Sequence, residues 1–176
     1  MINAAEMIMH EIAAVLAEIN ETDVEKLINA VRNAHRIFCC GAGRSGLMMK
    51  AFAMRLAQMG LCVYVTGETI TPAIEKGDLL VAASASGETD TICLFTEKAL
   101  SEGADLFIIS AKESSRLSAR HAVDVLLSAP DKDTPGGSSQ ALGSLFEQSL
   151  LIFCDAVVYA LHGGKEEMRK RHANME

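Results

Sequence analysis

The sequence predicts one doubly wound α/β domain, a three-layer sandwich in which a five-stranded parallel sheet lies between two layers of helices. Short runs that are apolar throughout alternate with segments of helical periodicity, a pattern typical of parallel strands buried on both faces. The chain has 176 residues and is 49% hydrophobic and 22% charged, which is enough for a sizeable core. No proline-rich or serine-rich linker divides it, so residues 1–176 are expected to form a single domain.

Two helices are expected before the first strand. Apolar residues recur at helical spacing over about residues 2–19, which predicts an amphipathic helix with a broad apolar face. We expect this face to take part in oligomer contacts, because a single domain leaves little else to cover it. Thr22-Asp-Val-Glu25 matches a capping box and predicts a second helix that extends to about Ala34.

The remaining elements follow from apolar runs and from glycines at their ends. Five short apolar runs predict strands over about residues 35–40, 61–66, 78–83, 104–109 and 123–127. Helical periodicity and helix-start residues predict helices over about residues 44–59, 88–101, 114–120 and 138–161. The expected strand order is 2-1-3-4-5, which is the flavodoxin-like arrangement, and a charged tail over residues 163–176 follows the last helix.

Composition excludes several classes of function. The formal net charge is −7 and the isoelectric point is near 5.2, so no nucleic-acid partner is expected. The first nineteen residues carry too many charges for a signal peptide or a membrane span. The five cysteines lie in apolar runs without a CxxC pair, which predicts buried, reduced thiols in a cytoplasmic protein. The five histidines show no metal-ligand spacing, so no metal is expected.

Ligands of doubly wound sheets bind beyond the carboxyl ends of the strands, and two loops there are rich in glycine and hydroxyl groups. Gly41-Ala-Gly43-Arg44-Ser45-Gly46 follows the first strand and opens a helix whose free amides can bind an anion. The same GxGxxG pattern fits a dinucleotide fingerprint, with Glu68 as the acid for a ribose, or a turn made only for tight packing.

The loop Ser84-Ala-Ser86-Gly87-Glu-Thr89 follows the third strand and also opens a helix. Its hydroxyl groups and backbone amides suit one compact anion, a phosphate monoester, better than an extended cofactor. An ordinary N-cap is the alternative interpretation. Glu68 and Thr69, after the second strand, add a carboxylate and a hydroxyl but also fit a solvated turn.

A candidate general base lies in the last helix. Glu147 stands among leucines and a phenylalanine, and a carboxylate in such company has a raised pKa if it faces the interior. The pattern does not decide whether Glu147 faces the interior or water. Ser139, just before this helix, is a further candidate, and the tail that carries His172 fits a solvated charged end on its residues alone.

Strand–GAGRSG–helix followed by strand–SASGET–helix resembles the sugar isomerase (SIS) domain family nearly end to end. The stretches VTGETITPAI, SLFEQ and RHANME resemble the members that interconvert 3-hexulose 6-phosphate and fructose 6-phosphate, the second step of the ribulose monophosphate route of formaldehyde fixation. The resemblance implies a cytoplasmic enzyme without a cofactor that forms homo-oligomers, usually tetramers, and binds a phosphorylated hexulose.

The resemblance also implies roles for individual residues. Glu147 would be the base that moves the proton, and His172 would close over the site, in cis or from a neighbouring subunit. The substrate and its phosphate would be held by residues of the two loops: Gly43, Arg44, Ser45, Ser84, Ser86, Gly87 and Thr89. Other phosphosugar isomerases, acting on arabinose 5-phosphate or sedoheptulose 7-phosphate, a non-catalytic phosphosugar sensor and a dinucleotide-dependent oxidoreductase remain alternatives.

Overall fold

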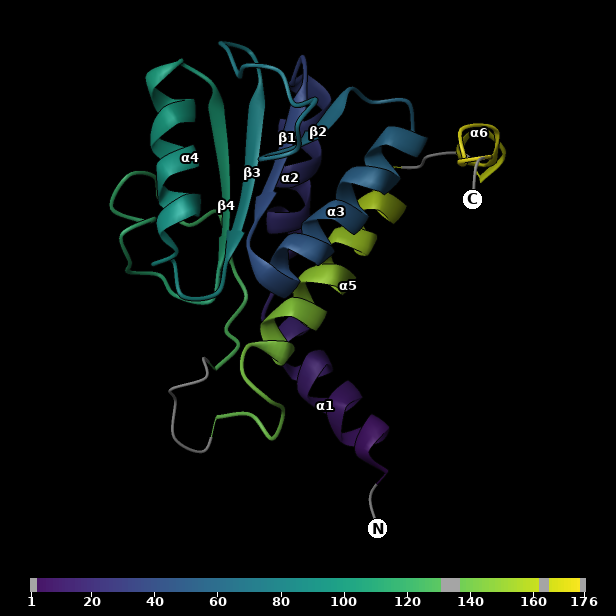
Figure 1. The fold of residues 1–176 in the computed structure, drawn as a ribbon. Coiled ribbons are helices and arrows are strands. Elements are labelled where there is room, and N and C mark those ends of the chain that lie inside the picture. The colour runs from purple at the N-terminus through teal and green to yellow at the C-terminus, as the bar shows by residue number, and fades with distance from the viewer. Residues whose placement is uncertain (1–2, 131–136, 162–164, 175–176) are drawn as a thin grey trace.

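The computed structural model describes residues 3–130, 137–161 and 165–174. Helices and strands alternate over most of this part of the chain (Figure 1). In chain order the elements are α1 (Ala4–Leu16), α2 (Glu21–Asn33), β1 (Ile37–Gly41), α3 (Gly43–Gln58), β2 (Val63–Val65), β3 (Leu79–Ser84), α4 (Asp90–Ser101), β4 (Asp105–Ser110), β5 (Val125–Leu126), α5 (Ser144–Ala160) and α6 (Lys165–Lys170).

The five strands form one parallel sheet in the order β2-β1-β3-β4-β5, which confirms the predicted fold class and strand order. Ile37 pairs with Val63 on one side of β1 and with Leu79 on the other. The strands that carry the two loops of interest, β1 and β3, are therefore direct neighbours. Their carboxyl ends, Gly41 and Ser84, lie at the same edge of the sheet, at the bottom of the view in Figure 1.

Helices cover both faces of the sheet, and the side chains of each strand alternate between the two faces. In β1, Ile37 and Cys39 point into the core shared with α2, α3 and α5, whereas Phe38 and Cys40 point toward α4. Figure 1 shows α3 and α5 side by side on one face and α4 on the other. Helix α1 packs on α5 at one end and extends beyond the rest of the molecule.

Two predictions at helix ends were wrong. Helix α2 begins at Glu21, so the cap is Asn20, whose backbone N–H donates to Asp23 at 3.4 Å, and not Thr22 with Glu25. Residues 114–120 form turns instead of a short helix. Ser115 and Ser118 each accept a hydrogen bond from the other's backbone N–H, and such side-chain bonds compete with helical hydrogen bonding.

The first and last long helices are shorter than predicted. Helix α1 ends at Leu16. Helix α5 begins at Ser144, because the residues before it make other contacts, described below. Four cysteines are buried as expected, but Cys62 is exposed. Within the described ranges, no helix has both the length and the apolar character needed to cross a membrane.

Candidate active site

The loops that follow β1, β3 and β4 converge at one edge of the sheet and enclose a cavity of about 470 Å³. The start of α5 closes it from the side. Four candidate residues from the sequence analysis line it: Ser45, Ser84, Ser86 and Thr89. The rest of the lining consists of Ala42, Ala83, Ala85, Glu88, Lys112, Pro130 and Gly143. The structure thus joins the two glycine-containing loops, as the resemblance implied.

The loop over residues 84–89, here called the phosphate loop after the role that the sequence predicts for it, is shaped by its own hydroxyl groups. Ser84 Oγ accepts a hydrogen bond from the Gly87 N–H at 3.1 Å and lies 3.3 Å from Thr89 Oγ1. Ser86 Oγ accepts from the Glu88 N–H at 3.2 Å. Thr89 is the N-cap of α4, and its side chain makes no capping hydrogen bond. Amides of the first helical turn can therefore bind an anion.

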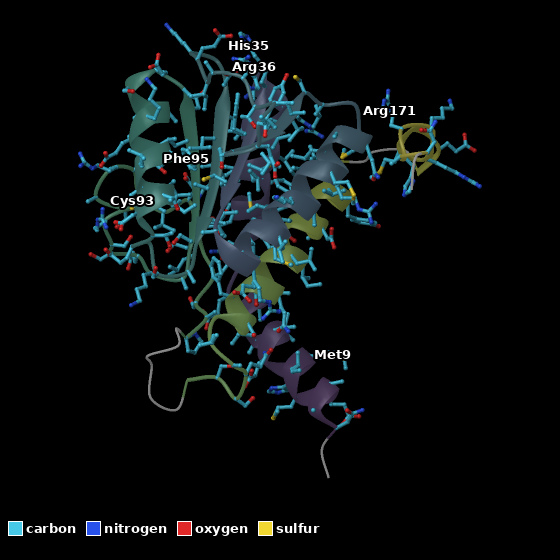
Figure 2. The ribbon with its side chains drawn as sticks, viewed as in Figure 1. Met9, His35, Arg36, Cys93, Phe95 and Arg171 are labelled. Atoms are coloured by element: carbon cyan, nitrogen blue, oxygen red, sulfur yellow. The ribbon has the colours of Figure 1, made fainter. Side chains whose placement is uncertain are left out.

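Gly87 is the residue that permits this loop conformation. Its φ is +67°, and a Cβ added there would lie 2.1 Å from Ser115 Oγ. Its carbonyl oxygen accepts hydrogen bonds from the Leu117 N–H at 3.0 Å and from Cys93 Sγ at 3.7 Å. Burial raises the pKa of the Cys93 thiol, so Cys93 acts here as a neutral donor. Cys93 belongs to the first turns of α4, close to the loop (Figure 2).

Glu147 and Arg44 meet across the helices α5 and α3. Glu147 Oε2 lies 2.9 Å from Arg44 Nη1, and the same Arg44 nitrogen donates to Ser144 Oγ at 2.6 Å. The Glu147 side chain is 15% exposed and that of Arg44 53%, so the carboxylate lies at the edge of the core while the guanidinium faces solvent. Gly143, which lines the cavity, accepts the Glu147 N–H through its carbonyl. The candidate base therefore lies beside the cavity.

The loop over residues 41–46, here called the glycine loop, lines a second cavity, of about 320 Å³, with Lys50 and Glu68. Lys50 Nζ and Glu68 Oε1 form an ion pair at 2.5 Å, and both side chains are about half exposed. Glu68 is therefore separated from the phosphate loop by the glycine loop, and Thr69 is exposed in the following turn. The structure does not bring these two candidates to Ser84 and Glu147. Gly43, with φ +56°, lies on this second side.

Ser139 lies in a cluster with α1. Its backbone N–H and its hydroxyl both donate to Glu11 Oε1, at 2.9 and 2.6 Å, and Ser138 and Gln140 donate to Glu11 Oε2. These hydrogen bonds lower the pKa of Glu11 to about 2. The segment that was predicted to begin the last helix is instead tied to α1, and Ser139 is engaged there and not in the cavity.

His172 lies far from the cavity of its own chain. Helix α6 contacts the carboxyl end of α3, where a Cβ on Gly60 would lie 3.1 Å from Arg171 Cζ (Figures 1 and 2). The glycine loop is at the opposite end of α3, a helix of 16 residues and about 24 Å. His172 is exposed, and its ring Nδ1 is 3.0 Å from the Ala173 carbonyl oxygen. In this arrangement His172 does not reach the cavity of its own chain.

Lys112, Glu88 and Pro130 line the cavity, although the sequence analysis did not name them. A signal for Lys112 was present, because it follows the fourth strand by two residues, at the edge where ligands bind. Glu88 Oε1 accepts the Arg116 N–H at 3.0 Å, which braces the phosphate loop from outside. Among the described residues, no group of three or more histidines, cysteines and carboxylates is placed to hold a metal ion.

A model of the SIS domain matches residues 30–156, and the chain belongs to the SIS domain family. The 3-hexulose-6-phosphate isomerase of Bacillus subtilis (strain 168) is 37% identical over 176 residues, covering 96% of this chain and 95% of that protein. The 3-hexulose-6-phosphate isomerase of Mycobacterium gastri is also 37% identical, over 99% of this chain and 90% of that one. Because these isomerases match over nearly the whole chain, the chain is identified as an isomerase of this family.

The fold agrees with this membership. A solved structure of a hypothetical protein from Methanococcus jannaschii, for which a molecular function of 3-hexulose-6-phosphate isomerase was inferred, superposes with a TM-score of 0.85. It is 28% identical and the match covers 98% of this chain and 99% of that one.

Proposed function

We propose that this enzyme interconverts 3-hexulose 6-phosphate and fructose 6-phosphate, through an enediol and without a cofactor. The observation that carries the proposal is the cavity itself, which is lined by the hydroxyl-rich phosphate loop and by Gly143, next to the helix turn where Glu147 pairs with Arg44. The names of the relatives that match over nearly the whole chain support the choice of sugar. The corresponding place in metabolism is the second step of the ribulose monophosphate route, and the corresponding compartment is the cytoplasm.

Glu147 is assigned as the base. It removes the proton from C2 of the 3-ketose, and the electron pair moves into a C2–C3 double bond while the carbonyl oxygen on C3 becomes an enediolate oxygen. The protonated Glu147 then returns its proton to C3, the carbonyl forms at C2, and the proton of O2 passes to O3, so that the carboxylate is regenerated. One carboxylate can serve both carbons because they are adjacent. Arg44, 2.9 Å from Glu147, is the cation that stabilises the enediolate.

His172 is assigned to the site of a neighbouring subunit. The cavity of its own chain lies about one helix length away, at the far end of α3, which favours a site in another copy. This requires a homo-oligomer, and a tetramer is the assembly we propose. There the imidazole would close over the sugar and donate to the enediolate.

A coupled assay with 3-hexulose 6-phosphate, read as formation of fructose 6-phosphate, tests the proposed activity. Arabinose 5-phosphate and sedoheptulose 7-phosphate are the control substrates, since turnover of either in preference to the hexulose would reassign the enzyme within its family. Measuring the melting temperature with NAD and with fructose 6-phosphate distinguishes a dinucleotide-binding protein from a phosphosugar-binding one. Fructose 6-phosphate should raise the melting temperature and NAD should not.

A further inference from the structure

Lys112 lies on backbone that is tied to the phosphate loop. Ser110, the last residue of β4, is fully buried; its Oγ accepts the Lys112 N–H at 3.2 Å and donates to the Ala85 carbonyl at 3.5 Å. The Ala111 N–H donates to the same carbonyl at 3.2 Å. The loop after β4 therefore keeps its register with the loop after β3, and the exposed Lys112 side chain lines the same cavity as Ser84 and Ser86.

The charge inside this cavity favours a role for a lysine. A phosphate monoester carries a charge of about −1.5 to −2 at pH 7. The hydroxyls of the phosphate loop and the amides of α4 are neutral donors, and Glu88, which also lines the cavity, repels an anion. The whole chain has a net charge of −7, so its overall field does not attract the substrate. Among the described residues that line the cavity, Lys112 is the one cation.

Arg44 is not among the residues that line this cavity, and it pairs with Glu147 beside it. It follows β1, whereas Lys112 follows β4, and β3 lies between these two strands. Two strand spacings amount to about 10 Å, a distance that an open-chain hexose phosphate can bridge. Arg44 and Lys112 thus follow strands on either side of β3, whose carboxyl end carries the phosphate loop.

We propose that Lys112 binds the substrate phosphate from the β4 side, which leaves Arg44 to the reacting carbons. The proposal rests on the proposed function, which supplies the phosphosugar. Lys112 thereby determines specificity for a phosphorylated sugar over its free form, and it contributes to the binding of substrate and product alike. Such binding, equal in the ground state and the transition state, changes KM and not kcat.

The test compares Lys112→Ala and Lys112→Arg with wild type in calorimetric titrations with fructose 6-phosphate and inorganic phosphate, and in steady-state kinetics. Lys26→Ala is the matched control, because Lys26 is an exposed lysine of α2 paired with Asp23. Loss of a charged hydrogen bond predicts that Lys112→Ala weakens both ligands about 10- to 100-fold and raises KM by a similar factor. Its kcat should stay close to that of wild type, Lys112→Arg should recover most of the affinity and Lys26→Ala should match wild type.

Two results would overturn this role for Lys112. One is unchanged affinity for both ligands in a folded Lys112→Ala protein, and the other is a fall in kcat at unchanged affinity, which would place the amine at the reacting carbons. A wild-type protein that binds fructose 6-phosphate through Lys112 but never turns over 3-hexulose 6-phosphate would refute the proposed activity and leave the phosphate contact standing. A wild-type protein that binds neither ligand would refute both.

Discussion

Glu147 and Arg44 neutralise each other before any substrate is present, because Oε2 and Nη1 are 2.9 Å apart. The pair is not a hydrogen bond by its angles, and Glu147 Oε2 has no hydrogen-bond partner among the described residues. In the mechanism that we propose, the enediolate oxygen would offer Arg44 a competing anion. A guanidinium that turned to this oxygen would stabilise the intermediate.

Glu147→Gln keeps the shape and removes the proton acceptor. General-base loss typically costs about 10²–10⁴-fold in rate, while substrate should still bind because the phosphate loop is intact. Hydrogen–deuterium exchange at C3 of fructose 6-phosphate in heavy water isolates the proton-transfer step. Wild type and the exposed control Glu21→Gln should exchange, and Glu147→Gln should not. Normal exchange in Glu147→Gln would assign the base to another group, with Glu68 or a neighbour's His172 next to be examined.

Ser86→Ala removes one hydroxyl from the phosphate loop. A hydrogen bond to a charged acceptor contributes about 1.5–3 kcal/mol, so fructose 6-phosphate affinity should fall by about one to two orders of magnitude in calorimetry. Ser101→Ala is the control, since Ser101 lies at the opposite end of α4 and its Oγ donates to the Lys98 carbonyl. Equal affinity in wild type and Ser86→Ala would mean that the phosphate binds elsewhere.

At the scale of elements, the phosphate loop depends on the turns over residues 114–120. Gly87→Ala combines two costs, a φ of +67° and a Cβ only 2.1 Å from Ser115 Oγ. Gly43→Ala has only the strain of a positive φ, +56°, because no atom beyond the neighbouring backbone lies within 4 Å of the added Cβ. We expect Gly43→Ala to lower the free energy of unfolding, measured with urea, by about 1 kcal/mol, and Gly87→Ala to lower it clearly more.

The double variant Gly87→Ala with Ser115→Gly separates these costs. Removing the Ser115 side chain relieves the contact, so the double variant should be less destabilised, relative to Ser115→Gly alone, than Gly87→Ala is relative to wild type. Strictly additive effects on the free energy of unfolding would show that the close approach does not brace the loop.

Strands and binding loops were predictable, but several helix ends were not. Apolar runs between glycines identify β1 and β3 because strands buried on both faces have a strong compositional signal. The turns at Ser115 and Ser118 and the cluster around Glu11 depend on side-chain-to-backbone bonds between particular partners, one of them 128 residues apart. The helical pattern around Glu147 correctly predicted that it lies in a helix. Its contact with Arg44 depends on the packing of α5 on α3, which the sequence does not show.

At the scale of the whole molecule, α1 extends beyond the rest of the fold, and Met7 and Met9 on it are 40% and 60% exposed (Figures 1 and 2). Exposed apolar side chains on a protruding helix favour association with another copy. Light scattering should therefore report an oligomer, with a tetramer as the expected mass, and Met7→Lys with Met9→Lys should weaken it. A stable wild-type monomer at micromolar concentration would contradict this expectation and the assignment of His172 to a neighbour's site.

If His172 serves a neighbouring subunit, two inactive proteins should restore each other. Each variant carries the group that the other lacks. A site is therefore complete when a His172→Ala chain supplies Glu147 and a Glu147→Gln chain supplies His172. When the two variants mix at random in equal amounts in a closed symmetric assembly, about a quarter of the sites contain both Glu147 and His172. Activity should therefore rise from near zero to about a quarter of wild type after the oligomers are dissociated and reassembled together. Each variant reassembled alone is the control, and a mixture that stays as inactive as its parts would show that Glu147 and His172 do not meet across an interface.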